Sequence, residues 1–178
     1  MTMTVIQHIE LGSAQANIDF TSIAGTYTDL YLQVSLRSSQ TDFPVTDVLV
    51  SFNNTSANQS QRNLRGYGGG VISQNRTDIL LGNMPSSANT SNTFSNGGMY
   101  VPNYTASASK SVSIDAVSES NATGTFDWWV NIGANLWADN SAINRITLTP
   151  SGGHNFVAGS SATLYGILKG SSGGVTVS

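Results

Sequence analysis

The sequence predicts an all-β fold, an antiparallel β-sandwich or jelly roll of about eight strands, in a single domain that spans residues 1–178. Three observations lead to this prediction. Apolar and polar residues alternate in several short stretches, which is the pattern of half-buried strands. Clusters of Gly, Asn, Ser and Pro separate these stretches and are typical of turns. No window repeats apolar residues at the three-and-four spacing of an amphipathic helix.

Five stretches show the alternation clearly, at residues 29–37, 47–52, 111–116, 126–132 and 145–149. Because successive side chains of a strand point to opposite faces, each stretch has one face that can enter a core. The residues predicted for these buried faces are Leu30, Leu32, Val34 and Leu36, then Val48, Val50 and Phe52, then Val112, Ile114 and Ala116, then Phe126, Trp128, Val130 and Ile132, and finally Ile146 and Leu148.

A sixth strand is predicted at residues 162–168, where both faces are apolar, so this strand should be central or covered. Residues 5–11 and 99–101 are weaker candidates. Turn residues gather at 53–54, 66–70, 96–98 and 150–153. A long loop is expected over residues 73–96, where no strand pattern stands out.

The two ends are expected to differ from the rest of the domain. Residues 1–11 are a candidate N-terminal arm, and residues 170–178 are predicted to form a flexible tail with too little apolar content to pack firmly. The N-terminal residues lack the basic flank and apolar run of a signal peptide. No stretch approaches the roughly 18 apolar residues of a membrane-spanning helix, so no membrane partner is predicted.

The chain is poor in charge, with seven Lys or Arg and ten Asp or Glu among 178 residues. An ordinary soluble domain carries about a quarter charged residues. Ser, Thr, Asn and Gly together supply 79 residues instead. Catalysis and phosphate binding depend on ionisable side chains, so this composition favours a structural or adhesive module. The net charge of −3 and the scattered basic residues argue against a nucleic-acid partner.

No motif indicates a catalytic, metal or cofactor site. Asp115 and Asp127 lie on outer strand faces, and a chance pair of carboxylates at glycosidase spacing is expected in any sandwich with ten acids. His8 and His154 stand outside any metal-binding or triad pattern. The glycine-rich run at 66–70 lacks the lysine and the following helix of a phosphate-binding loop. We therefore predict no catalytic residue, no metal and no cofactor.

The tryptophans are the remaining candidates for a binding site. Trp128 is predicted to lie in the core, in register with Val130, so Trp129 would point to the opposite face. Trp137 lies near the end of its strand. An outward tryptophan could stack on a sugar ring or anchor a protein partner. The alternative, that Trp129 packs under the loop at 73–96, is equally compatible with the sequence.

The chain also predicts self-association. Exposed edge strands are commonly protected by lysine, and this chain has only two lysines. A neighbouring subunit is the simplest cover, which suggests a homo-oligomer. The apolar residues of the N-terminal arm could add a strand to a partner's sheet; they are Met3, Val5, Ile6 and Ile9.

Two parts of the sequence resemble a known group of proteins. One comprises residues 25–39 (GTYTDLYLQVSLRSS), 50–54 (VSFNN) and 63–66 (NLRG), and the other is residues 143–167, which begin INRITLTPSGGHNF. Together they resemble small virion structural proteins of tailed phages, particularly phages of cyanobacteria and other aquatic bacteria. The resemblance is weak over residues 73–105, and it rests on packing and turn motifs that define no functional residues.

The resemblance implies a non-enzymatic jelly-roll capsid cement, or decoration protein. Such a protein binds the outer surface of the capsid as a dimer or trimer and stabilises the shell. The implied partner is the major capsid protein, and the implied location is the virion exterior after assembly in the host cytoplasm. The alternative is a receptor- or carbohydrate-binding module of a tail fibre or spike, with Trp129 or Trp137 as the stacking platform. A polysaccharide depolymerase is the least favoured of the three.

Overall fold

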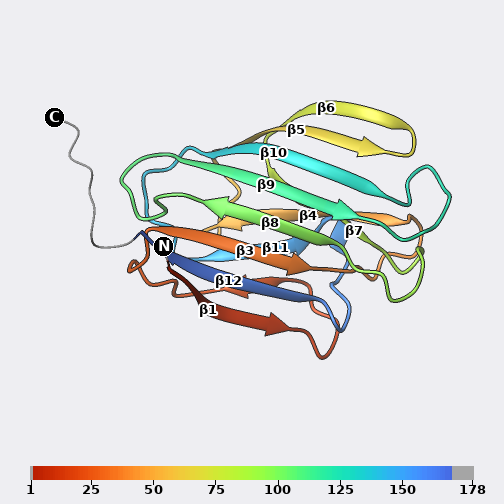
Figure 1. Ribbon diagram of the computed structural model, residues 1–178, viewed down its shortest axis with the longest axis horizontal. Helices are drawn as coiled ribbons and strands as arrows, with labels where there is room; N and C mark the ends of the chain where they lie inside the picture. Colours follow the sequence, from red (N-terminus) through yellow and green to blue (C-terminus); the bar gives the residue numbers. More distant parts are fainter. Residues whose placement is uncertain (1, 170–178) are drawn as a thin grey trace.

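Twelve strands form two antiparallel sheets in the computed structural model, which describes residues 2–169 (Figure 1). The large sheet has the order β1 (Thr2–Glu10), β12 (Ser161–Leu168), β3 (Asp29–Ser35), β8 (Asn96–Val101), β9 (Lys110–Ser118), β10 (Trp129–Trp137), β5 (Gln59–Tyr67) and β6 (Gly70–Arg76). The small sheet has the order β2 (Ile18–Phe20), β11 (Ile146–Pro150), β4 (Val45–Phe52) and β7 (Ile79–Pro85). The predicted all-β antiparallel sandwich is confirmed.

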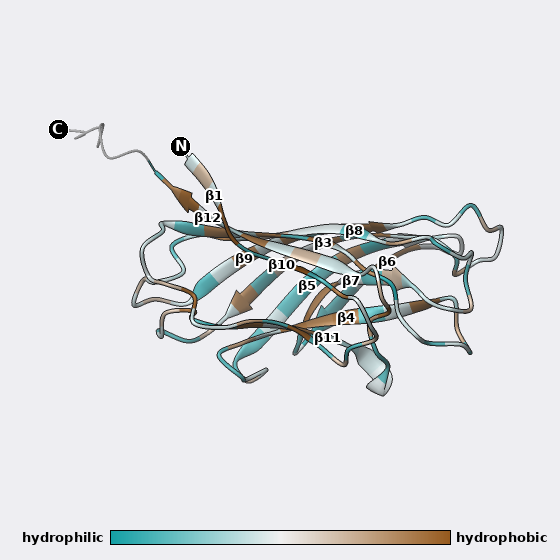
Figure 2. Cartoon of the chain, turned by 90° about the horizontal axis from the view of Figure 1, so that it is seen from below, coloured by the Kyte–Doolittle hydropathy of each residue, from teal (hydrophilic) through white to brown (hydrophobic). Residues whose placement is uncertain are grey.

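The core lies between the two sheets, which Figure 2 shows as separate layers with β4 and β11 beneath the large sheet. Strands β3, β4, β9 and β11 bury the faces that their alternation predicts, for example Leu32, Val50, Ile114 and Leu148. Strand β12 is interior to its sheet, between β1 and β3, as its two apolar faces predict. A single 3-10 turn, Ser151–Gly153, follows β11, and no described helix is long and apolar enough to cross a membrane.

The N-terminal segment is a strand of the protein's own sheet. Strand β1 pairs with β12, with a bulge between Val5 and Gln7, and forms one edge of the large sheet. Met3 and Val5 are exposed, whereas Ile6 and Ile9 pack against the core. The expectation of a separate arm is therefore corrected for residues 2–10, which form an edge strand of the protein's own sheet. The predicted tail at 170–178 lies outside the described residues.

Strand β10 has the opposite orientation to the one predicted. Trp129 is buried and Val130 and Ile132 are exposed, whereas the alternation had placed Val130 and Ile132 in the core. Trp128, also assigned to the core, is half-buried just before the strand. The period of two correctly groups the residues that share a face. Both faces of β10 carry large side chains, however, so the pattern could not decide which face meets the small sheet.

Three strands were missed in the stretch from residue 59 to residue 85. The fully buried residues of β5 are all polar, and β7 is buried along its whole length, so neither strand shows the expected alternation of buried apolar and exposed polar residues. Strands β5 and β6 form a hairpin with Gly68 and Gly69 at the turn. The segment after β7 belongs to the long loop expected over residues 73–96. Arg37 holds it in place, because its guanidinium donates to the carbonyl oxygens of Asn89, Thr90 and Thr93.

Asp29, the first residue of β3, is a fully buried carboxylate. It accepts hydrogen bonds from the Tyr100 hydroxyl at 2.7 Å and the Asn103 amide at 2.9 Å, and Lys169 Nζ lies 3.4 Å away. Burial by itself raises the pKa of Asp29, but these partners outweigh it, so its pKa lies below the ordinary value of 3.8.

We expect Asp29→Asn to lower the free energy of unfolding at neutral pH by about 1–2 kcal/mol, because a charged acceptor of several hydrogen bonds is lost. A carboxyl group with a lowered folded-state pKa contributes stability above its unfolded pKa of 3.8 and loses that contribution as the pH falls through the folded value. The variant should therefore lose less stability than the wild type in this acidic window, measured by denaturant unfolding at several pH values. Asp42→Asn, in an exposed loop, is the control. An unchanged acid dependence in the Asp29 variant would contradict the assignment.

Candidate functional site: the outer sheet face and the inter-sheet cleft

The face of the large sheet that points away from the small sheet exposes large apolar side chains. We call the following set the outer apolar surface: Leu64, Val71, Val117, Val130, Ile132 and Leu136, with exposed fractions between 38% for Leu136 and 71% for Val71. These residues come from the four neighbouring strands β9, β10, β5 and β6. The inverted orientation of β10 is what brings three of them to the surface.

Strand register makes this surface continuous. Ile132 lies opposite Leu64, and Val130 lies opposite Val117, so cross-strand neighbours on this face are in reach of each other. Val71 continues the row, because both it and Val130 pair with Gly66, which has no side chain. Apolar residues exposed singly are ordinary, but a contiguous set is a mark of an interaction site.

Charge is sparse on the same face. Among the outward-facing residues of β9, β10, β5 and β6, only Arg62 and Asp115 carry charge; the others are Ser, Asn, Ala and Gly beside the apolar set. A shallow groove of about 450 Å³ adjoins the outer apolar surface, lined by Tyr100, Pro102, Ser111, Ser113, Ile132 and Ala134.

The other half of the outer face carries tyrosines. Val5, Tyr165, Tyr31 and Tyr100 pair in that order across β1, β12, β3 and β8. The Tyr31 and Tyr165 rings are tilted, with centroids 6.4 Å apart, and both residues are half-buried. Met3 and Val5, which the sequence suggested for partner binding, thus share this face with the outer apolar surface but lie at its opposite edge.

The two tryptophans suggested as outward platforms are both buried. Trp129 is 7% exposed; the Arg65 guanidinium lies 4.4 Å from its ring centroid, the Tyr67 ring stacks on it at 4.7 Å, and its indole Nε1 donates to the Phe126 carbonyl oxygen. Trp137 is 1% exposed and packs against Phe52. The expectation that either ring is an outward-facing platform is corrected, because neighbouring side chains cover both, and Trp129 contributes only part of the lining of a cleft between the sheets.

Aromatic rings that the sequence analysis did not single out are exposed nearby. Phe43 and Phe126 are 39% and 41% exposed, and their ring centroids lie 5.3 Å apart. Phe126 also stacks on Tyr67, nearly parallel, at 5.6 Å, so a row of rings runs from Phe126 through Tyr67 to Trp129. Phe126 had been assigned to the core by its alternation with Trp128, but it lies in the turn before β10, where that alternation has no meaning.

A cleft of about 340 Å³ opens beside these rings, between the two sheets. Its lining includes Phe43, Phe126, Asp47, Arg65, Asn83 and His154. The inner face of β5 and β6 meets β4 and β7 here, at the free edge of the large sheet. The inward side chains Gln59, Gln61, Asn63 and Arg65 of β5 are polar and buried, although the same face is apolar on β3 and β9.

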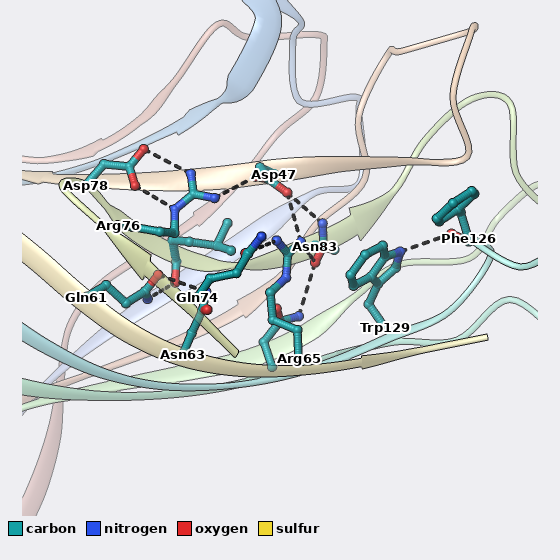
Figure 3. Close-up of polar contacts among 12 residues, drawn as sticks. Asp47, Gln61, Asn63, Arg65, Gln74, Arg76, Asp78, Asn83, Phe126 and Trp129 are labelled. Atoms are coloured by element: carbon teal, nitrogen blue, oxygen red, sulfur yellow. Dashed lines mark hydrogen bonds and ion pairs between the residues drawn. The ribbon is translucent and has the colours of Figure 1, made fainter. Parts of the chain in front are cut away.

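The polar side chains beside the cleft hold one another in place (Figure 3). Arg65 donates to Asn83 at 2.7 Å and to Gln74 at 3.1 Å, and it lies 3.4 Å from an oxygen of Asp47. Asn83 donates to the same oxygen of Asp47 at 2.7 Å. Burial lowers the pKa of Arg65, partly offset by Asp47, but arginine has ample reserve to remain charged.

The second arginine completes a neutral cluster. Arg76 donates to Asp78 at 2.6 Å and lies 3.4 Å from the other oxygen of Asp47, and the hydrogen bond with Asp78 raises the pKa of Arg76. Two arginines therefore face two aspartates, and their formal charges cancel. Within the described residues some buried polar atoms of this region have no hydrogen-bond partner, among them Asn63 Oδ1, Arg65 Nε and Asn131 Oδ1.

Comparisons with protein-family models, with curated proteins and with solved structures found no match.

Proposed function

We propose that this protein is a non-enzymatic structural component of a tailed-phage virion, a capsid cement protein that binds the outer surface of the major capsid protein. It would act as a homodimer or homotrimer on the exterior of the virion, after assembly in the host cytoplasm. The observation that carries the proposal is the outer apolar surface on β9, β10, β5 and β6. The resemblance of residues 25–39 and 143–167 to such proteins adds to it.

The outer apolar surface is suited to protein contact for a thermodynamic reason. Covering apolar area releases about 25 cal/mol per Å², whereas leaving it in water forgoes that gain. Strand β10 turns Val130, Ile132 and Leu136 outward and keeps Asn131 and Asn135 inside. The same orientation buries Trp129 and Trp137, but the exposure of these three apolar side chains adds no stability to an isolated domain. A protein that stays bound to a neighbouring protein does gain stability from them, because the neighbour covers these side chains.

A cement protein acts through many copies, so each contact can be modest. Since only Arg62 and Asp115 carry charge among the outward-facing residues of these four strands, few contacts of this surface can be ionic. Salt screens charge pairs and leaves apolar contact largely intact. Binding to the shell should therefore depend little on ionic strength, a useful property for a particle released into water of varying salinity.

We expect the purified protein to rebind shells stripped of it and to raise the temperature at which those shells disrupt. Leu64→Asp and Ile132→Asp should each weaken rebinding by roughly 10-fold or more, because each places a charge at the centre of the buried contact. Thr149→Asp, exposed on β11 of the small sheet, is the matched control and should rebind like the wild type. Sedimentation of shells with bound protein gives the affinity, and scanning calorimetry gives the disruption temperature.

The location on the particle decides between the proposed role and its alternative. A specific antibody should label the head of the virion in electron micrographs. Labelling of the tail, or rebinding that is equal for Ile132→Asp and the wild type, would contradict the cement function and its assigned surface. Tail labelling would point instead to a receptor-binding part.

A further inference from the structure

The inter-sheet cleft is a second candidate site, separate from the outer apolar surface. Its volume of about 340 Å³ lies at the lower end of the roughly 300–1,000 Å³ found for small-molecule sites. Nothing in the proposed cement function uses it. The cleft combines two exposed aromatic rings, Phe43 and Phe126, with a carboxylate, Asp47, whose side chain is one-quarter exposed.

The aromatic side of the cleft is rigid before any ligand arrives. Phe126 is backed by Tyr67 at 5.6 Å, and Tyr67 in turn stacks on the buried Trp129 at 4.7 Å. Arg65 lies over that last ring. An apolar ligand face that packs on Phe126 and Phe43 therefore loses little side-chain entropy from the protein, and preorganisation of this kind favours affinity.

The polar side is equally well fixed. Arg65 and Asn83 hold one oxygen of Asp47, and Arg76 lies beside the other. Each carboxylate oxygen still has a lone pair to accept a hydrogen bond from a ligand hydroxyl. Arg65, which lines the cleft and is 6% exposed, has no partner for its Nε within residues 2–169.

The charge balance selects the class of ligand. Arg65 and Arg76 are matched by Asp47 and Asp78, so the cluster presents no net charge to an ion. An anionic ligand would have to compete with Asp47 for the guanidinium of Arg65. A cation would have to separate Asp47 from two arginines. A neutral molecule with one apolar face and several hydroxyl groups avoids both costs.

We infer that this cleft binds a neutral saccharide, with the apolar face of one sugar ring against Phe126 and Phe43 and a hydroxyl group donating to Asp47. The site is independent of the outer apolar surface, so the protein can hold the virion and a glycan at the same time. Such a contact would let a shell protein adhere to sugar-coated cell surfaces or mucilage.

The test uses the full-length protein on an array of neutral and acidic oligosaccharides, followed by calorimetric titration of the neutral oligosaccharide with the strongest signal. Phe126→Ala should weaken that binding by roughly 10-fold, from the loss of the stacking surface. Asp47→Asn should weaken it by roughly 10-fold or more, since the accepting charge is lost while a carbonyl oxygen remains for Arg65 and Asn83. Leu64→Ala, on the outer apolar surface, should leave glycan binding unchanged.

The outcomes separate this inference from the cement function. Because Asp47 also holds the cluster together, Phe43→Ala provides a second variant at an exposed position and should weaken binding without lowering the melting temperature. Three results would each overturn the inference. No neutral glycan binds, sulfated or sialylated glycans bind more tightly than neutral ones, or the Phe43→Ala and Phe126→Ala variants bind with the affinity of the wild type. Shell rebinding by these two variants should equal that of the wild type.

Discussion

Gly82→Ala is expected to lower the free energy of unfolding by about 2–3 kcal/mol, at the upper end of the usual cost of overpacking a core. Gly82 lies in β7, where the small sheet approaches β9 of the large sheet most tightly. A Cβ atom at this position would lie 2.5 Å from the Cβ of Ala116, closer than real carbon atoms pack. Two backbones, held by their own sheets, would have to separate. Denaturant unfolding followed by tryptophan fluorescence measures the loss.

A double variant makes this expectation specific. Ala116→Gly removes the methyl group that the new side chain meets, so Gly82→Ala combined with Ala116→Gly should recover most of the stability lost in the single variant. Gly12→Ala is the control for the substitution itself, because a Cβ there meets nothing within 4 Å. If Gly82→Ala is as stable as Gly12→Ala, the two sheets do not approach each other at Gly82 and Ala116 as closely as described.

Lys110→Met is expected to cost about 2–4 kcal/mol, because it leaves several buried carbonyl oxygens without a donor. Lys110 begins β9 and is 2% exposed. Its Nζ donates to the carbonyl oxygens of Ala106, Asp139 and Ser141, and it lies 5.5 Å from the ring centroid of Trp137. One ammonium group thus joins the loop before β9 to the loop after β10. Methionine keeps most of the side-chain volume but offers no donor.

The matched control for this variant removes a positive charge from the surface instead of from the interior. Arg62→Met, on the exposed face of β5, should change the free energy of unfolding by less than about 0.5 kcal/mol. Hydrogen exchange adds a local measure, since the amide of Ser141 and its neighbours should lose protection in Lys110→Met. Equal stability of the two variants would mean that Lys110 does not fasten these loops.

The shortage of charge has a more definite meaning in three dimensions than in the sequence. The few ionic side chains look scattered along the chain, yet Asp47, Arg65, Arg76 and Asp78 gather at one end of the sandwich. Asp29 and Lys110 serve as buried acceptor and donor for backbone and hydroxyl groups. The remaining surface is largely neutral, which is the property on which the proposed shell contact depends.

The candidate sites were harder to predict than the fold, and the aromatic residues show why. Trp129 and Trp137 were singled out because tryptophan is common at binding sites, but both are buried, with exposed fractions of 7% and 1%. Phe43 and Phe126 carry the exposed rings beside the cleft. Phe43 precedes Pro44 in a loop, where no periodic signal applies, and the alternation that included Phe126 assigned it to the core although it lies in the turn before β10. Their proximity, 5.3 Å between centroids, is a product of the tertiary fold.

The sequence by itself determined the all-β class and the buried faces of β3, β4, β9 and β11, because each of these strands has one face that is plainly more apolar than the other. Only the tertiary structure decided that β10 turns Trp129 inward and Ile132 outward, and that β5 points polar side chains into the sandwich. A period of two says which residues share a face of a strand. Which face is covered depends on where the second sheet ends, and that is fixed by contacts between residues far apart in the chain.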